Sequence, residues 1–378
     1  MKNLKYITFA ILLASATVNA QQDSVKIQKQ DSTKYKERAF QLTFVSPVGT
    51  NGLDCYKTTN HVSINVLAGV SRGLKGFEVG TFANVILKDV EGVQFAGFTN
   101  VVLGNVNGAQ FSSYFNYCGK DLKGASFAGL GNVGLGELHG GQFTAGVNVN
   151  RKGGKGVQVA AYTNVILGDF QGAQISAGTN VALGKLEGAQ IGIVNVAKKV
   201  KGVQVGFVNI ADSVDGASIG FLNFIKKGKH QIEVSGDELF YANLSYKTGT
   251  DAFYNIFTTG FKPGSNLWHF GYGAGTSFKL NSKLKADISA TAHHVNTGGF
   301  YFGTSELVRL YCGVEYKLAK KLSIAAGPTF NLYVSDALQD DYTSSKKNIV
   351  PYHSFDHTTT NDFNVKGWIG GRIALRFF

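Results

Sequence analysis

A glycine recurs at a fixed interval through the central part of this chain. The interval is sixteen residues from Gly76 to Gly188 and fourteen residues from Gly188 to Gly216. An asparagine follows each glycine at a constant offset, eight residues later in the long units and seven residues later in the last three. Such a period marks a repeat architecture, in which each unit buries its apolar side against its neighbours. The sequence therefore predicts ten stacked units of 14–16 residues over residues 72–229.

Three positions define most units: the leading glycine, a glutamine two residues after it, and the asparagine. Glycine adopts backbone angles that other residues avoid, and side-chain amides can hydrogen-bond along a stack of identical residues. The residues that we expect to form the structural repeat are Gly92, Gln94, Asn100, Gly108, Gln110, Asn116, Gly156, Gln158, Asn164, Gly172, Gln174, Asn180, Gly188, Gln190, Asn195, Gly202, Gln204 and Asn209.

Two architectures could use this repeat. In a β-solenoid each unit is one coil with two strand faces and two corners, and neighbouring coils run parallel. In a meander each unit is one strand and one turn, and the repeats could join the later strands in one large antiparallel β-barrel. Because the period is even, equivalent residues of successive units point to the same face, as a parallel stack requires. Apolar residues where a meander would place exposed turns also favour the solenoid: Val90, Val106, Leu122, Leu138, Phe170, Leu186, Val200 and Val214.

The period ends near residue 229, and longer alternating segments fill residues 230–378. Most of these segments have one apolar face and one polar or small face, which is typical of an outer-membrane-type β-barrel. Aromatic residues near segment ends could form interfacial girdles, among them Tyr246, Trp268, Tyr333 and Trp368. A soluble antiparallel barrel or sandwich is the alternative. The eight candidate strands are 231–236, 239–247, 251–259, 266–280, 283–293, 304–317, 321–334 and 366–378.

The two ends of the chain carry further signals. Residues 1–20 have two early lysines, a short apolar run and a small-residue cleavage site, as in a secretory signal peptide. Residues 21–38 are polar and predict a flexible leader, and residues 39–71 predict N-terminal strands. The last residue, Phe378, ends an amphipathic segment, which resembles the C-terminal signal of outer-membrane barrel proteins. We therefore expect an exported protein.

The composition agrees with an all-β fold. The chain has 48 glycines, only 4 prolines and 16% charged residues, which suits turn-rich β structure. The net charge is +12, but the lysines gather only at 198–201 and 226–229. These clusters indicate either an anionic lipid or polysaccharide surface or a solvated rim. The basic clusters lack interleaved aromatic residues, so we expect no nucleic-acid partner.

Few residues suggest chemistry. His353 and His357, with Asp356 between them and Asp340, Asp341 and Asp362 nearby, form the one metal-like cluster in the sequence, and a solvated loop is the interpretation that we favour. Cys55, Cys118 and Cys312 are far apart, as expected of small buried residues rather than a disulfide framework. The repeat is poor in acidic residues, so its coils do not resemble those of β-helix enzymes. We predict no enzyme activity, no cofactor and no bound metal.

The units 188–195 and 202–209 resemble the Gly-x-Gln-x-Gly-x-x-Asn units of a bacterial surface-repeat protein family, which was named from leptospires and is common in Bacteroidetes. The segments 44–52 and 241–246 also look like its bacteroidete members. The resemblance implies an exported, surface-exposed envelope protein. It carries no catalytic residues.

Three functions fit these observations. The first is a non-enzymatic outer-membrane surface repeat protein, in which a barrel anchored in membrane lipid presents the array for adhesion to a polysaccharide or protein ligand, or for envelope structure. The second is a pore or transport channel formed by the repeats together with the C-terminal strands. The third is a soluble periplasmic or secreted β protein. We expect the first, in the cell outer membrane and exposed at its surface.

Overall fold

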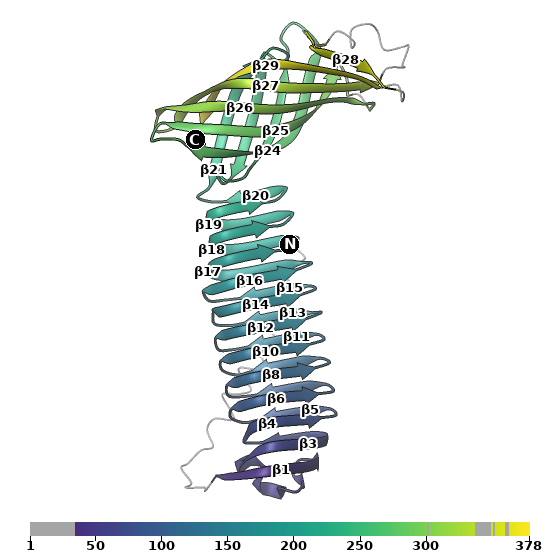
Figure 1. The fold of residues 1–378 in the computed structure, drawn as a ribbon, viewed down its shortest axis with the longest axis vertical. Coiled ribbons are helices and arrows are strands. Elements are labelled where there is room, and N and C mark those ends of the chain that lie inside the picture. The colour runs from purple at the N-terminus through teal and green to yellow at the C-terminus, as the bar shows by residue number, and fades with distance from the viewer. Residues whose placement is uncertain (1–34, 301, 337–348, 351, 360–362) are drawn as a thin grey trace.

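The computed structural model describes residues 35–300, 302–336, 349–350, 352–359 and 363–378. The expected signal peptide and most of the expected leader lie outside these residues. The described chain is all-β apart from one short 3-10 helix, η1 (Gly52–Lys57), and it has no helix that is long and apolar enough to cross a membrane. Figure 1 shows a long rod of stacked strands with a barrel at one end.

The rod is a parallel β-solenoid. Equivalent strands of adjacent coils pair in parallel with glycine opposite glycine and glutamine opposite glutamine, as in Gly156–Gly172 and Gln158–Gln174. The predicted solenoid is therefore confirmed, and the meander with one large antiparallel barrel is wrong because neighbouring units run in the same direction. Its strands are β1 (Lys36–Val45), β2 (Val48–Gly49), β3 (Thr58–Ser71), β4 (Gly73–Gly80), β5 (Ala83–Ile86), β6 (Val90–Ala96), β7 (Thr99–Val102), β8 (Val106–Ser112), β9 (Phe115–Cys118), β10 (Leu122–Ala128), β11 (Gly131–Gly134), β12 (Leu138–Thr144), β13 (Val147–Asn150), β14 (Gly154–Ala160), β15 (Thr163–Ile166), β16 (Phe170–Ser176), β17 (Thr179–Ile191), β18 (Val194–Val205), β19 (Val208–Ile219) and β20 (Leu222–Ile225).

The leading glycine of each coil allows the coils to stack closely. Gly172 has φ +145°, a conformation that side chains other than glycine rarely adopt. A Cβ atom on Gly172 would lie 1.8 Å from the carbonyl oxygen of Gly156 in the preceding coil. The regular glycine is therefore required both by the backbone angle and by the contact between coils.

The apolar corner residues point inward, as predicted. Val90, Val106, Leu122, Leu138 and Leu186 are at most 1% exposed and belong to one continuous core along the rod. The opposite corner contributes Ile86, Val102, Cys118, Ile166 and Ile225 to the same core. Cys55 and Cys118 are buried, Cys312 is partly exposed, and all three are free thiols.

The outward side of the rod is also apolar, which is unusual for a surface in water. Side chains flanking the buried glutamine point outward, and Phe95, Phe111, Phe127 and Phe143 stack in successive coils with ring centroids 4.7–4.8 Å apart. Single exposed apolar residues need no explanation, but a continuous exposed stripe indicates an interaction surface.

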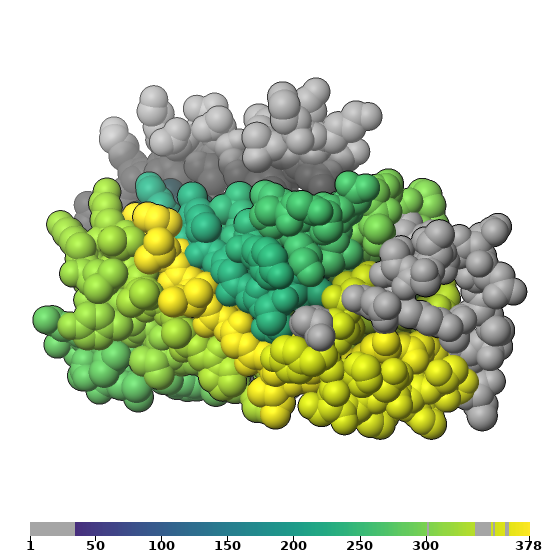
Figure 2. Space-filling model, turned by 90° about the horizontal axis from the view of Figure 1, so that it is seen from above, coloured from purple at the N-terminus to yellow at the C-terminus, as the bar shows by residue number. Residues whose placement is uncertain are grey.

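The second part is a closed antiparallel barrel. The last strand pairs with the first, from Ile232–Phe377 to Asp237–Arg372, and Figure 2 shows the yellow C-terminal strand lying against the teal start of the barrel. All eight predicted strands are present, with ends shifted by a few residues. They are β21 (Lys229–Asp237), β22 (Ala242–Gly249), β23 (Tyr254–Phe261), β24 (Leu267–Lys279), β25 (Leu284–Thr297), β26 (Ser305–Ala319), β27 (Leu322–Asp336) and β29 (Phe363–Phe377), with β28 (Phe355–Thr358) paired beside the first half of β29.

The two ends of the barrel differ. One end has only short connections, 250–253, 280–283 and 320–321, together with the start of β21 and the C-terminal residue Phe378. The other end has the connections 238–241, 262–266 and 298–304 and the long link between β27 and β29. The rod joins the end with the tight connections, because β20 leads directly into β21 (Figure 1).

Candidate functional site

Buried asparagine side chains form a continuous ladder along the rod. The Nδ2 atom of Asn164 donates to Oδ1 of Asn180 at 2.9 Å and to the backbone oxygen of Ile175 at 2.8 Å. Its Oδ1 atom accepts from Nδ2 of Asn148 at 2.9 Å. The same pattern repeats in each coil, and every asparagine of the ladder is at most 2% exposed: Asn65, Asn84, Asn100, Asn116, Asn132, Asn148, Asn164, Asn180, Asn195, Asn209 and Asn223.

A glutamine ladder runs beside it in the opposite sense. Where glutamines stand in successive coils, each donates to the preceding one, as from Gln174 Nε2 to Gln158 Oε1 at 2.9 Å and from Gln190 Nε2 to Gln174 Oε1 at 2.8 Å. Ser126 replaces one glutamine and donates instead to Oδ1 of Asn132 at 2.7 Å. The glutamines and asparagines predicted for the repeat are therefore brought together in two internal ladders.

The glutamine ladder ends on a carboxyl group. Glu78 occupies the glutamine position of its coil, is fully buried, and accepts hydrogen bonds from Gln94 at 2.7 Å and Asn65 at 3.0 Å. Burial away from water raises the pKa of Glu78 to about 7, although these hydrogen bonds partly offset the rise. The rod thus contains an ionisable group in its core that titrates near neutral pH.

The asparagine ladder continues from the rod into the barrel. Asn223, in the last coil, donates to Oδ1 of Asn255 on β23 at 2.5 Å, and Asn255 donates back to the oxygen of Gly220 at 2.8 Å. The rings of Phe221 and Tyr272 contact each other across the same junction, with centroids 4.7 Å apart and planes tilted by 36°. Buried hydrogen bonds and ring contacts therefore attach the rod firmly to the end of the barrel.

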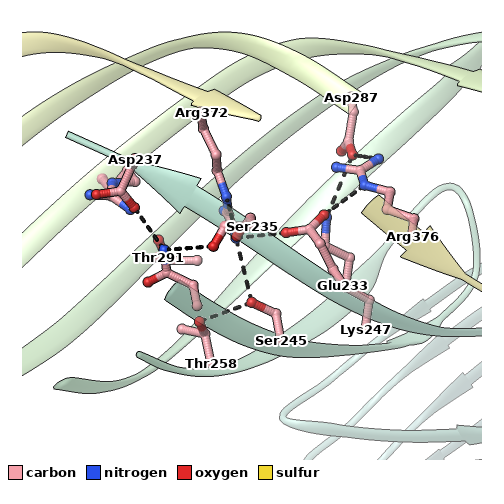
Figure 3. Close-up of polar contacts among 12 residues, drawn as sticks. Glu233, Ser235, Asp237, Ser245, Lys247, Thr258, Asp287, Thr291, Arg372 and Arg376 are labelled. Carbon is pink, nitrogen blue, oxygen red and sulfur yellow. Dashed lines mark hydrogen bonds and ion pairs between the residues drawn. The ribbon is translucent and has the colours of Figure 1, made fainter. Parts of the chain in front are cut away.

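Charged side chains fill the interior of the barrel. Glu233 lies at the centre of the cluster in Figure 3, within 2.7 Å of Lys247 and within 2.6 Å of Arg372 and Arg376. Arg376 also contacts Asp287 at 2.5 Å and Glu315 at 2.6 Å. Glu233, Lys247, Asp287 and Arg376 are at most 1% exposed. Burial of this many charges is tolerated because each has partners of opposite sign.

A second polar group lies toward the other end of the barrel. Arg309 contacts Asp237 at 2.6 Å and donates to Asn331 at 2.8 Å. Asn331 and Trp368 both donate to Glu238, at 3.1 Å and 2.6 Å. This group closes the interior above the Glu233 cluster.

The filled interior bears on the possibility of a channel. Eight-stranded barrels are just wide enough for side chains to fill them, and here ion pairs from opposite walls occupy that space. The repeats form a separate rod and contribute no strand to the barrel wall. The predicted channel made of repeats and C-terminal strands is therefore wrong.

The outer wall of the barrel is apolar. On β21, Ile232 and Val234 are about half exposed, whereas the residues between and beside them face inward and are buried. On β29, the predicted apolar face of Ile369, Ile373, Leu375 and Phe377 points outward. Apolar side chains outside, polar side chains inside and complete closure are the features of an outer-membrane β-barrel.

The expected aromatic girdle is only partly correct. Tyr246 is 43% exposed on the outer wall, as an interfacial residue should be. Tyr333 and Trp368 are 1% and 3% exposed and face the interior, where Ser305 and Glu238 bond their polar atoms. Alternation places them inside because their strand neighbours, Leu332 and Ile369, occupy the outer wall.

The candidate metal cluster is not assembled in the described structure. His353 Nε2 lies 3.6 Å from Asp356 Oδ2, and His357 lies on the exposed strand β28. Among the described residues no group of three or more potential ligands comes together. Asp340, Asp341 and Asp362 lie outside the part of the chain that the structure describes.

The sequence predicted strands with one apolar face and one polar or small face, but it did not predict the ion-pair network. The sequence feature that could have indicated this network is the presence of both acidic and basic residues on the polar faces of the alternating segments. Glu233, Lys247 and Asp287 sit at inward positions of strands whose other face is apolar. Charged residues at such positions must find partners across the barrel, although the pairing depends on how the strands close.

Comparison with known proteins gives one similarity. No protein-family profile and no curated protein matches the chain. Among solved structures, the crystal structure of Neisserial surface protein A is similar at 16% sequence identity, over 39% of this chain and 92% of that chain, with a TM-score of 0.22.

The first prediction concerns the asparagine ladder. We expect Asn164→Ala to lower the free energy of unfolding by about 3 kcal/mol, because it removes the side-chain acceptor of Asn148 and the side-chain donor to Ile175 and Asn180 in the buried ladder. Urea denaturation of the full chain in detergent, followed by proteolysis of the rod, measures the change. Thr163→Val, on the outward face of the same strand, is the control. An effect of Asn164→Ala no larger than that of the control would contradict the ladder's role.

The second prediction concerns pH. Below about pH 4.5 Glu78 is protonated in both the folded and unfolded chain. Between pH 4.5 and about 7 the unfolded chain loses this proton while the folded rod keeps it, so the free energy of unfolding falls as pH rises. The total decrease is on the order of 3 kcal/mol.

Glu78→Gln should remove this decrease, whereas Glu91→Gln, at an exposed position one coil away, should keep it. Denaturation midpoints measured at pH 4.5, 6 and 8 test the comparison. A wild-type pH profile that is unchanged in Glu78→Gln would show that this carboxyl group is not responsible.

The third prediction concerns the barrel. We expect Arg376→Ala to destabilise the barrel by about 3–5 kcal/mol, because it removes the cation that contacts Glu315 and the nearer of the two cations beside Asp287. The temperature at which the folded band disappears in a heat-modifiability gel reports the loss. Ile373→Val, on the lipid-facing side of the same strand, is the control. Equal melting of both variants would mean that the network contributes little.

Proposed function

We propose that this protein is a non-enzymatic outer-membrane protein whose barrel holds a rigid β-solenoid in the periplasm, where the rod serves envelope structure. The observation that carries the proposal is the place at which the rod leaves the barrel. The rod joins the end that carries the tight connections and both termini of the barrel.

The sidedness follows from the usual build of outer-membrane barrels. These barrels have short turns on the periplasmic side and longer loops on the outside. Here the connections at the rod end, 250–253, 280–283 and 320–321, have two to four residues. At the other end 238–241 has four, 262–266 and 298–304 are longer, and the link between β27 and β29 is the longest. With the tight end in the periplasm, the rod points into the periplasm as well.

This proposal departs from the surface exposure that the family resemblance implies. Kinship with the surface-repeat family stays a prediction from the Gly-Gln-Asn units, and a polysaccharide or protein ligand stays untested. Of the two roles expected from the sequence, envelope structure fits a periplasmic rod better than adhesion to an external surface does.

The dimensions of the rod suit a spacer. Ten coils at about 4.8 Å each give a length on the order of 50 Å. The internal ladders bond every coil to the next, and the junction bonds the last coil to the barrel. Such a rod would hold its far end, near β1, at a constant distance from the membrane.

The absence of enzyme activity is part of the proposal. The buried carboxylates of the barrel have cationic partners at hydrogen-bond distance, as Glu233 and Asp237 show. Carboxylates held in this way are suited to stabilising the barrel interior rather than to acid-base chemistry.

Cysteine labelling in whole cells tests the sidedness. Lys155→Cys places a thiol on the exposed surface of the rod, and Asn266→Cys places one at the loop end of the barrel. We expect a membrane-impermeant maleimide to label Asn266→Cys in intact cells and Lys155→Cys only after the outer membrane is permeabilised. The wild-type chain, with Cys55 and Cys118 buried, measures the background.

The opposite labelling pattern would place the rod outside the cell and restore the adhesion hypothesis. Release of the protein by a carbonate wash without detergent would exclude membrane anchoring altogether and leave a soluble β protein.

A further inference from the structure

An open groove of about 460 Å³ lies where the last three coils of the rod approach the barrel. Its floor is apolar. Val196, Ile210 and Phe224 pair with one another in successive coils, so their side chains form a continuous column on the outward face. The column leads toward the barrel and is long enough for part of an acyl chain.

A charged column borders this floor. Two residues after each floor residue lie Lys198, Asp212 and Lys226, all of them exposed and all lining the groove. The equivalent position is leucine in five of the seven earlier coils and charged in one of them, whereas all three of the last coils carry a charge there. The earlier residues are Leu87, Leu103, Gly119, Leu135, Arg151, Leu167 and Leu183.

The change from leucine to charge occurs at the edge of the barrel's apolar wall. His230, the outward residue at the start of β21, lines the groove and contacts Tyr246 Oη at 3.0 Å and the backbone oxygen of Ile225 at 2.7 Å. The headgroup layer of a bilayer is about 5–8 Å thick on each side, and coils are spaced by about 4.8 Å. One or two of the last coils therefore lie at the level of the headgroups.

We propose that this groove binds one phospholipid with an amine headgroup, taken from the leaflet that faces the rod. The acyl chain lies along Val196, Ile210 and Phe224. The phosphate lies near the ammonium groups of Lys198 and Lys226, and the headgroup amine lies near the carboxylate of Asp212. The alternation of cation, anion and cation along the rod matches the opposite charges of such a headgroup.

The inference rests on the proposed membrane anchoring, but the groove can be tested separately. The probe is phosphatidylethanolamine, added to the purified full chain in detergent and followed by native mass spectrometry. We expect the wild type to retain one lipid. Lys198→Gln with Lys226→Gln should weaken retention about tenfold or more, and Asp212→Asn should remove the preference for phosphatidylethanolamine over phosphatidylcholine.

The matched control is Lys123→Gln with Lys155→Gln, which removes the same charge from exposed positions on earlier coils. Equal lipid retention by the groove variant and this control would overturn the proposal. Competition by millimolar inorganic phosphate that fully displaces the lipid would overturn it as well, because it would show an anion site without an acyl subsite.

Two further measurements separate failure of the groove from failure of the anchor. Heat-modifiable gel mobility shows that the barrel of each variant is folded. A requirement for detergent after carbonate washing shows that the protein is anchored in the membrane. A folded, anchored double variant with undiminished lipid retention would overturn the groove and leave the proposed function intact.

Discussion

Side-chain amides that bond from coil to coil are the interaction on which this structure depends. An asparagine in the core of a protein must satisfy both its donor and its acceptor, because an unpaired buried polar group costs about as much as several apolar contacts contribute. A stack of identical coils places the next amide at hydrogen-bond distance, as between Asn164 and Asn180. The ladder thereby fixes the register of every coil, while the glycine beside it lets the backbones approach.

Both parts of the molecule bury polar side chains and expose apolar ones. The rod has amide ladders inside, between its apolar corners, and apolar rings outside, and the barrel has ion pairs inside and an apolar wall outside. In the barrel the reason is geometric, since eight strands enclose only enough space for side chains, and the polar face of each strand must be satisfied there. The Asn223–Asn255 bond joins the asparagine ladder of the rod to a buried residue of the barrel. Because this junction is fixed, the orientation of the barrel determines the direction in which the rod points.

That coupling connects the fold with the proposed function. A barrel that inserts with its tight connections in the periplasm carries the rod to the same side, and the junction holds it there without a flexible linker. The last coils then meet the lipid headgroups. Coils at the level of the headgroups would need charged side chains, and Lys198, Asp212 and Lys226 stand there in place of leucine. The aromatic stripe further along the rod remains available to a partner.

The sequence by itself determined the repeat period and the eight barrel strands, because glycine spacing and side-chain alternation depend only on local geometry. It favoured coils with two faces and two corners, but only the parallel pairing of equivalent strands excluded the meander. It also identified the ladder residues from Gly92 to Asn209. Only the tertiary structure decided that Glu78 ends one ladder and Asn255 continues the other, since neither residue belongs to an intact repeat unit. Closure of the barrel likewise decided which charges pair with Arg376, and turned Tyr333 and Trp368 inward. Such contacts join residues far apart in the chain, and no local pattern specifies them.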